Sequence, residues 1–251
     1  MLTVNHEEKI AILTFKHGPA SALDLEFCQA INKALLEIRA SDARALVITG
    51  SGSVFSAGVD LNRMLQGRAE YISEFLPEFG QVLETLLFFP KPVVAAVNGH
   101  AIAGGGLMAC AADARLMAAG TGRIGVPELR VGVAFPPLAM ELMRSRLNPL
   151  ATTDVLLSGK LCTPEDAEAY GMIHKVVNKD ELLSVAISKA QKLAEVQPEL
   201  YALTKEQLNQ PIREAIDAGQ ARWGDQIMTQ WQSDQAMESL AAYIKMMFGK
   251  K

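Results

Sequence analysis

Apolar positions along the first half of the chain follow two periods. Residues 45–50 and 93–97 are short, mostly apolar runs rich in Val, which is typical of strands buried on both faces. Over residues 24–40 and 70–88, apolar side chains recur every three or four positions, which predicts helices that pack by one face. The alternation of strand and helix favours an α/β layer with right-handed crossovers.

The rest of the chain extends this pattern. Further strands are predicted at residues 2–5, 8–15, 114–119, 123–125 and 172–177. Asp24 is placed to cap the first helix. From Lys179 onward the pattern is almost wholly helical, with breaks expected near Pro198 and Pro211.

The strand at 93–97 leads through small residues into a glycine triplet, Gly104 to Gly106, and then into a helical pattern. Such a strand, turn and helix leave backbone N–H groups unpaired at the helix N-terminus, where negative charge is stabilised. The following residues, Leu107 and Met108, are not those of a phosphate loop, and the triplet does not match a dinucleotide fingerprint. Close packing of a helix on a strand is the alternative explanation.

Composition excludes several classes of protein. With 251 residues and 49% hydrophobic content, the chain can bury a substantial core. Its net charge of −4 gives no reason to expect nucleic acid or a membrane as a partner. Apolar runs stay below the roughly 18 residues that a membrane span needs, and no signal-peptide core is visible, so we expect a cytoplasmic protein. Three scattered cysteines offer no disulfide framework and no paired metal spacing.

Three segments together resemble the enoyl-CoA hydratase/isomerase superfamily, the crotonases. They are Phe55-Ser56-Ala57-Gly58-Val59-Asp60-Leu61, Asn98-Gly99-His100-Ala101 with the glycine triplet, and Pro127-Glu128 with Gly132. The resemblance covers nearly the whole chain and is more specific for the fold than for the reaction. It implies a crotonase-like spiral of repeated ββα units over residues 1–195 and a C-terminal helical oligomerisation region over residues 196–251. It also implies a homotrimer or a dimer of trimers.

The resemblance further implies a site that holds the enolate oxygen of an acyl-CoA thioester on two backbone N–H groups. Carried over by motif, the two donors are Ala57 and Gly105. The residues expected around the substrate and its CoA are Ser56, Ala57, Gly58, Asp60, Leu61, Gly104, Gly105 and Met108. Asp60 also has a structural alternative, because a carboxylate just beyond a turn readily accepts local N–H bonds. CoA is part of the substrate, so we expect no separate cofactor and no metal.

The acidic residues decide the reaction. In the hydratases of this superfamily two glutamates hold and activate water, and their positions match Met108 and Glu128 here. Hydration needs a fixed water and a proton shuttle, whereas a shift of a double bond needs one base. The favoured interpretation is a Δ3,Δ2-enoyl-CoA isomerase in which Glu128 carries a proton from C2 to C4. Met108 would then exclude water and, by desolvation, raise the pKa of Glu128.

Alternatives stay open at the level of the sequence. Hydration with a replacement group, thioester hydrolysis and C–C cleavage use the same enolate, and a decayed acyl-CoA-binding protein would use no chemistry at all. Glu128 could brace a turn after Pro127. Glu74, Glu78 and Glu84 could supply a second acid, although their spacing favours a solvated face. Acyl-chain length is not predicted, because it depends on how residues 64–88 and 135–147 pack.

Overall fold

The computed structural model describes residues 1–248, and residues 249–251 of the predicted C-terminal region lie outside the described part. The larger sheet consists of β1 (Leu2–Glu7), β2 (Ile10–Phe15), β3 (Ala45–Thr49), β5 (Val93–Val97), β7 (Ala114–Ala118) and β9 (Lys175–Val177). The smaller sheet consists of β4 (Val54–Ser56), β6 (His100–Ile102) and β8 (Ile124–Gly125). The helices are α1 (Leu25–Ala40), α2 (Leu61–Leu87), α3 (Gly104–Ala111), α4 (Glu128–Val131), α5 (Pro137–Arg146), α6 (Pro149–Ser158), α7 (Pro164–Ala169), α8 (Leu182–Ala194), α9 (Pro198–Gln232) and α10 (Asp234–Phe248), with a 3-10 turn, η1 (Lys179–Glu181), before α8.

The two sheets are built together by a repeating unit. After β2, each unit adds one strand to the larger sheet, one strand to the smaller sheet and then a helix, giving β3-β4-α2, β5-β6-α3 and β7-β8-α4. The ladders between these successive units are parallel in both sheets, and β1 pairs antiparallel with β2. The predicted α/β spiral of ββα units is confirmed.

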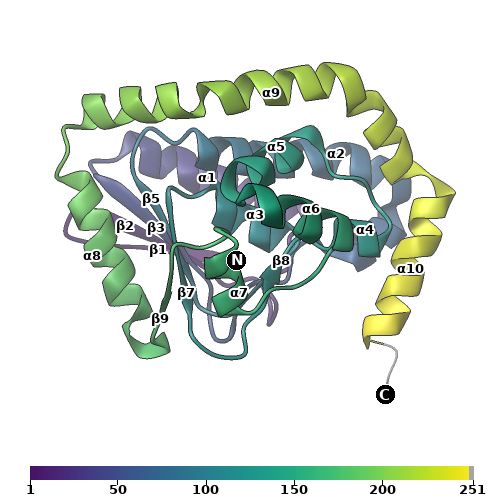
Figure 1. Cartoon of the computed structure of the whole chain (residues 1–251), viewed down its shortest axis with the longest axis horizontal. Coiled ribbons are helices and arrows are strands. Elements are labelled where there is room, and N and C mark those ends of the chain that lie inside the picture. Colours follow the sequence, from purple (N-terminus) through teal and green to yellow (C-terminus); the bar gives the residue numbers. More distant parts are fainter. Residues whose placement is uncertain (249–251) are drawn as a thin grey trace.

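Both faces of the larger sheet are covered, as its apolar runs predict. In β3, Leu46 and Ile48 join the main core with α1 and α2, while Val47 faces a second core under α8. This alternation explains why the run at 45–49 is apolar at every position but the last. Figure 1 shows α8 on the opposite side of the sheet from α1 and α3. The strand predicted at 172–177 is shorter, since β9 begins at Lys175.

Helix α2 begins nine residues before the predicted start at residue 70, at Leu61, and is interrupted at Arg68, where φ is 50° and ψ −141°. The Asp60 side chain accepts hydrogen bonds from the N–H groups of Asn62 and Arg63 and so caps the helix. Asp60 therefore has the structural role that its position allows. The Asp24 cap of α1 is also confirmed, through a bond from the N–H of Phe27.

The C-terminal region is an outer arm of two helices. Figure 1 shows α9 running along the whole molecule and α10 turning sharply away from its end. Pro198 opens α9 as predicted, but the break predicted at Pro211 is wrong, because the helix continues through it. Pro211 and Gln207 are exposed, so the Gln207 carbonyl that lacks a helical partner remains open to water. Asn209 fastens this stretch to α2 through the Leu87 carbonyl, at 3.0 Å.

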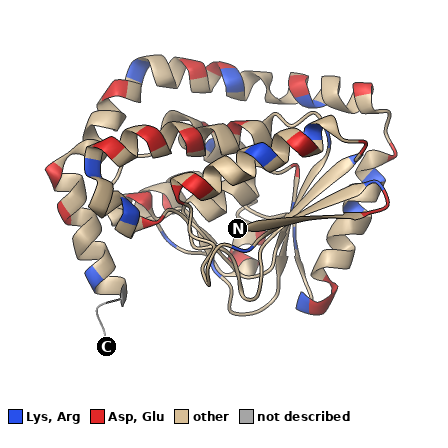
Figure 2. Ribbon diagram, turned by 180° about the vertical axis from the view of Figure 1, so that it is seen from behind, with Lys and Arg blue, Asp and Glu red and all other residues tan. Residues whose placement is uncertain are grey.

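Charged residues lie mainly on the helices, and the strands of the larger sheet are largely uncharged in Figure 2. This distribution follows from the layering, since the helices form the solvent-facing shell. Over residues 1–248, no helix combines the length and hydropathy that a membrane crossing requires.

Candidate active site

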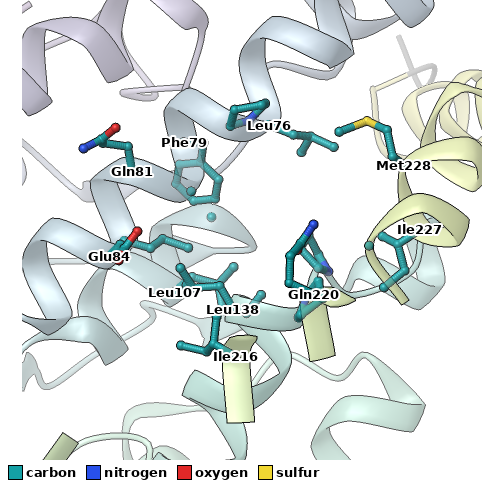
Figure 3. A pocket seen from close by; sticks show the side chains of 18 of the residues that line it. Leu76, Phe79, Gln81, Glu84, Leu107, Leu138, Ile216, Gln220, Ile227 and Met228 are labelled. Carbon is teal, nitrogen blue, oxygen red and sulfur yellow. The ribbon is translucent and has the colours of Figure 1, made fainter. Parts of the chain in front are cut away.

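A cavity of about 430 Å³ lies between α2, α5 and α9, and we call it the central cavity. Its apolar wall includes Val59, Leu76, Phe79, Leu83, Leu107, Leu138, Ile216, Ile227, Met228 and Trp231, and its polar wall Gln81, Glu84, Glu128, Arg213, Asp217 and Gln220. Figure 3 shows Gln81 and Glu84 on one side of the open space and Ile227 and Met228 on the other. A mostly apolar cavity with few polar groups is the usual form of a small-molecule site.

Two glycine-bearing turns meet at one end of this cavity. They follow β4 and β6, which are neighbours in the smaller sheet. A Cβ on Gly58 would lie 2.4 Å from the Ile102 carbonyl oxygen, and one on Gly105 would lie 2.4 Å from the Ser56 carbonyl oxygen. Side chains are therefore excluded where the two backbones touch. Close packing, the alternative explanation of the triplet, is correct, and it brings the N–H groups of both turns together.

The first turn has one N–H group left over. The N–H of Ala57 donates to the Ala20 carbonyl at 2.9 Å, and that of Gly58 donates to Ser56 Oγ at 3.1 Å. The N–H of Asp60 donates to the Leu23 carbonyl at 2.9 Å. These bonds contradict the prediction that Ala57 supplies the anion-binding donor, because its N–H is already used.

Val59 is the residue that the motif-based prediction missed. It forms a parallel bridge with Leu23, in which the neighbours Gly58 and Asp60 make the hydrogen bonds and the N–H of Val59 points away. Within residues 1–248 no acceptor is bonded to this N–H, and Val59 lines the central cavity. The sequence offered one signal for this assignment. In an extended segment alternate N–H groups face the same side, so the position along the segment decides which N–H faces the cavity.

The second turn leads into α3. Its last residue, Ala103, holds φ 49° and ψ −120°, a conformation that L residues rarely adopt, and its N–H donates to the Gly125 carbonyl at 2.8 Å. Leu107 is the first residue whose N–H bonds back into the helix, to Ala103 at 3.0 Å. Gly104 and Gly105 therefore present free N–H groups at a helix N-terminus, next to the cavity wall that Gly104 forms. The predicted donor Gly105 is compatible with this geometry.

Glu128 is the acid at this end of the cavity. Its side chain is 6% exposed, and over the described residues its Oε2 atom has no hydrogen-bond partner. Burial raises the pKa of Glu128 to about 8, in the direction that the sequence predicts. Gln230 of α9 holds the segment that follows α4, accepting from the Ala134 N–H at 3.0 Å and donating to the Gly132 carbonyl at 2.9 Å. Glu128 is thus a buried, unpartnered carboxyl on a fixed support.

The other predicted residues have different surroundings. Ser56 Oγ donates to the Ser21 carbonyl at 2.8 Å, which fixes the first turn. Leu61 is half-buried against the core and is not part of the cavity wall. Met108 is fully buried in the core and is not among the residues that line the central cavity, so its contact with the substrate stays a prediction. Leu107, its neighbour, lines the cavity.

The polar end of the cavity was also missed. Glu84, weighed as a second acid with its spacing favouring a solvated face, accepts a hydrogen bond from Arg213 of α9 at 3.0 Å and lines the cavity. Helical periodicity in α2 cannot reveal this, because the partner comes from a helix more than a hundred residues later. Over residues 1–248 there is no group of three or more side chains able to hold a metal ion.

Comparison with known proteins agrees with this geometry. The family model described as enoyl-CoA hydratase/isomerase matches residues 5–247. A probable enoyl-CoA hydratase of Mycobacterium bovis is 25% identical over 97% of this chain and 95% of its own length. The apo structure of the Mtb enoyl-CoA isomerase is 30% identical, with a TM-score of 0.80 over 96% of this chain and 97% of that one. Human mitochondrial Δ3-Δ2-enoyl-CoA isomerase shares the fold, with a TM-score of 0.91, 24% identity and coverage of 100% of this chain and 99% of its own. This chain belongs to the enoyl-CoA hydratase/isomerase family.

Proposed function

We propose that this protein is an enoyl-CoA isomerase that moves the double bond of a 3-enoyl-CoA to the 2-trans position. The observation that carries the proposal is Glu128, the buried carboxyl of the cavity wall, whose Oε2 has no hydrogen-bond partner among residues 1–248 and whose surroundings in the cavity are mostly apolar. The other acids of that wall, Glu84 and Asp217, come from α2 and α9 at the end where Glu84 is paired with Arg213. One base is what a proton shift requires.

The thioester oxygen would be held between the two turns. We place it on the N–H groups of Val59 and Gly105, with the α3 N-terminus behind the second donor. Preorganised N–H groups stabilise the charge that develops on this oxygen without rearranging, which lowers the barrier to enolate formation. The CoA moiety would extend from the thioester along the first turn. Its predicted contacts with Ser56, Gly58, Asp60 and Leu61 stay a prediction.

Glu128 would then act twice. Its carboxylate takes the C2 proton, and the electron pair of that bond spreads over C2, C4 and the thioester oxygen as a dienolate. The same carboxyl, now protonated, returns the proton to C4, and the double bond settles between C2 and C3 in conjugation with the thioester. Base and acid are one residue, so the cycle ends with Glu128 ionised as it began.

Hydration is the competing reaction, and the names of related proteins divide between hydratase and isomerase. Isomerisation is favoured here by the residue that stands at the position of the second hydratase glutamate. That residue is Met108, which is apolar and fully buried. It offers no acceptor to fix a water beside Glu128.

The test compares two substrates. Purified protein is incubated with 3-hexenoyl-CoA and, separately, with 2-hexenoyl-CoA, and the absorbance of the conjugated enoyl thioester is followed. We expect conjugation to appear from the first substrate and to persist in the second. Net loss of absorbance from 2-hexenoyl-CoA would overturn the proposal in favour of hydration, and silence with both would overturn it in favour of another acyl-CoA reaction or binding alone.

Assembly into trimers, or into a dimer of trimers, stays a prediction that belongs with this proposal. Exposed apolar side chains on α6, such as Leu150 and Leu157, and on α10, such as Met246, offer surface for it. Sedimentation equilibrium of the purified protein would give the mass directly.

A further inference from the structure

A second cavity, also of about 430 Å³, adjoins the central one. It lies between the C-terminal end of α2 and the first half of α9, with Thr85, Ala202 and Asn209 in its wall. The two cavities share four wall residues, Gln81, Glu84, Phe88 and Arg213. The two cavities therefore meet at these four residues.

An ion pair spans this boundary from helix to helix. Arg213 Nη1 of α9 lies 3.0 Å from Glu84 Oε1 of α2, and the guanidinium lies over the Phe88 ring at 3.7 Å from its centroid. The two side chains are 41% and 51% exposed, and pairs of this kind contribute only about 0–1 kcal/mol to stability. The position of the ion pair is more informative than its strength. The pair lies at the end of the central cavity away from Glu128, where the second cavity begins.

The distance from the reacting end to this boundary corresponds to a medium-length chain. Phe79 lies beside the second turn, since a Cβ on Gly104 would be 2.9 Å from its Cζ. Along α2, Glu84 lies five residues beyond Phe79, and Phe88, whose ring the guanidinium covers, lies nine residues beyond it, which is roughly 8–13 Å at about 1.5 Å per residue. An extended chain advances roughly 1.2 Å per bond, as three backbone bonds cover about 3.6 Å. A chain of about seven to twelve carbons therefore reaches from the level of Phe79 to the ion pair.

The wall between these points is open to an alkyl chain. Leu83, Leu138 and Ile216 supply apolar side chains, and Gly80 leaves a gap on α2, where a Cβ would meet nothing within 4 Å. Figure 3 shows Leu107, Leu138 and Ile216 along the lower edge of the open space, between Glu84 and Gln220. An alkyl chain would be buried along this path until it reached the charged pair, which offers it no favourable contact.

We propose that the Glu84–Arg213 pair is the stop that limits the acyl group to about eight to twelve carbons, and that longer chains need it opened to enter the second cavity. The proposal rests on the proposed function, because it takes the central cavity as the acyl site. The pair is a specificity-determining contact and takes no part in the proton transfer.

The test measures binding across a series of saturated acyl-CoA thioesters, hexanoyl, octanoyl, decanoyl, dodecanoyl and hexadecanoyl, by calorimetry. For the unaltered protein we expect affinity to rise with chain length, by at most about fourfold per buried methylene, and to stop rising near decanoyl to dodecanoyl. Arg213→Ala should let the rise continue to hexadecanoyl, by about tenfold or more, with octanoyl affinity changed by less than about twofold.

Arg144→Ala is the matched control. It removes an Arg–Glu pair of the same 3.0 Å length, between Arg144 and Glu141 of α5, at an exposed arginine outside both cavity walls. It should leave the whole series unchanged. Gly80→Leu is the second variant, and it should fill the path and shorten the preferred chain whether or not Arg213→Ala folds. Combined with Arg213→Ala, it should cancel the gain for hexadecanoyl-CoA.

An Arg213→Ala series identical to the unaltered one, or a shift of the same size in Arg144→Ala, would overturn the stop. Should Arg213→Ala fail to fold, an unshortened Gly80→Leu series would overturn it instead. These results are independent of the reaction. If binding follows the expected series but 3-hexenoyl-CoA is not isomerised, the proposed function is wrong and the chain-length stop is retained. If 3-hexenoyl-CoA is isomerised but binding does not follow the expected series, the stop is wrong and the proposed function is retained.

Discussion

Glu128 and Glu84 line opposite ends of one cavity and have opposite surroundings. Glu128 is 6% exposed with an unpartnered oxygen, and burial raises its pKa to about 8. Glu84 is 51% exposed and paired with Arg213. A buried carboxyl without a partner can bind a proton and return it, whereas the Glu84 carboxylate is engaged by a guanidinium. In the proposed function this difference separates proton transfer at one end of the cavity from recognition of the acyl chain at the other.

Glu128→Gln is expected to have the largest effect on activity. The amide keeps the shape of the side chain but cannot accept the C2 proton, so kcat for 3-hexenoyl-CoA should fall by roughly 10²–10⁴-fold or more. Affinity for octanoyl-CoA should change little, which calorimetry would check. If isomerisation is retained, Glu128 is not the base.

Stability should respond to the same substitution in a pH-dependent way. The folded pKa of Glu128, about 8, lies above its unfolded value of about 4.3, so the unfolded state ionises first as pH rises. The carboxyl therefore lowers stability increasingly from about pH 4.3 up to about pH 8, and a glutamine does not. The melting temperature of Glu128→Gln should exceed that of the unaltered protein more at about pH 8 than at about pH 5. An equal difference in melting temperature at both pH values would show that folding does not raise the pKa of Glu128.

A pair of proline substitutions tests which N–H holds the enolate. Proline removes the backbone donor. Val59→Pro deletes an N–H to which no acceptor is bonded within residues 1–248, so the protein should fold and lose about 10²–10³-fold in kcat. Ala57→Pro deletes the 2.9 Å bond to Ala20 and should lower the melting temperature. Full activity in a folded Val59→Pro variant would return the donor role to another residue.

The pH dependence of the reaction gives a smaller effect. Isomerisation begins with ionised Glu128, so kcat/KM should rise through a pKa of about 8 and level off above it. Between about pH 6 and pH 8 the ionised fraction of Glu128, and with it kcat/KM, should rise by about fiftyfold. Measurement of initial rates in buffers of constant ionic strength would show it, and a flat profile over this range would mean that the free enzyme already carries an ionised base.

Local patterns predicted the layers of the fold well. Burial on both faces makes the strand at 93–97 apolar throughout, and burial on one face gives the helix at 24–40 its apolar period. The position of Glu128 at the cavity was predicted for a similar reason, since a motif fixes it within its own segment. Pro211 was misjudged because its effect depends on whether the carbonyl of Gln207 meets water, which is a property of the surface and not of the sequence pattern.

The donor was misplaced for a comparable reason. Ala57 and Val59 differ only in which side of an extended segment their N–H faces, and the contact with residues 20–23 decides that. Leu107 and Met108 show the same limit, because only the packing of α3 decides that Leu107 is the one in the cavity wall and Met108 is in the core. Contacts between segments distant in sequence set these details, and a single sequence does not display them.

Glu84→Gln is expected to have the smallest effect, and this makes it a sharp control for Glu128. The amide retains one acceptor toward Arg213 and loses only an exposed charge, so stability should change by about 0.5 kcal/mol or less. Turnover of 3-hexenoyl-CoA should stay within about twofold, because the five C–C bonds of a six-carbon chain span roughly 6 Å at about 1.2 Å per bond and end before the ion pair. Loss of turnover comparable to that of Glu128→Gln would show that Glu84 reaches the reacting carbons. The two carboxylates would then act as a pair of acids, and hydration would become the better account of the site.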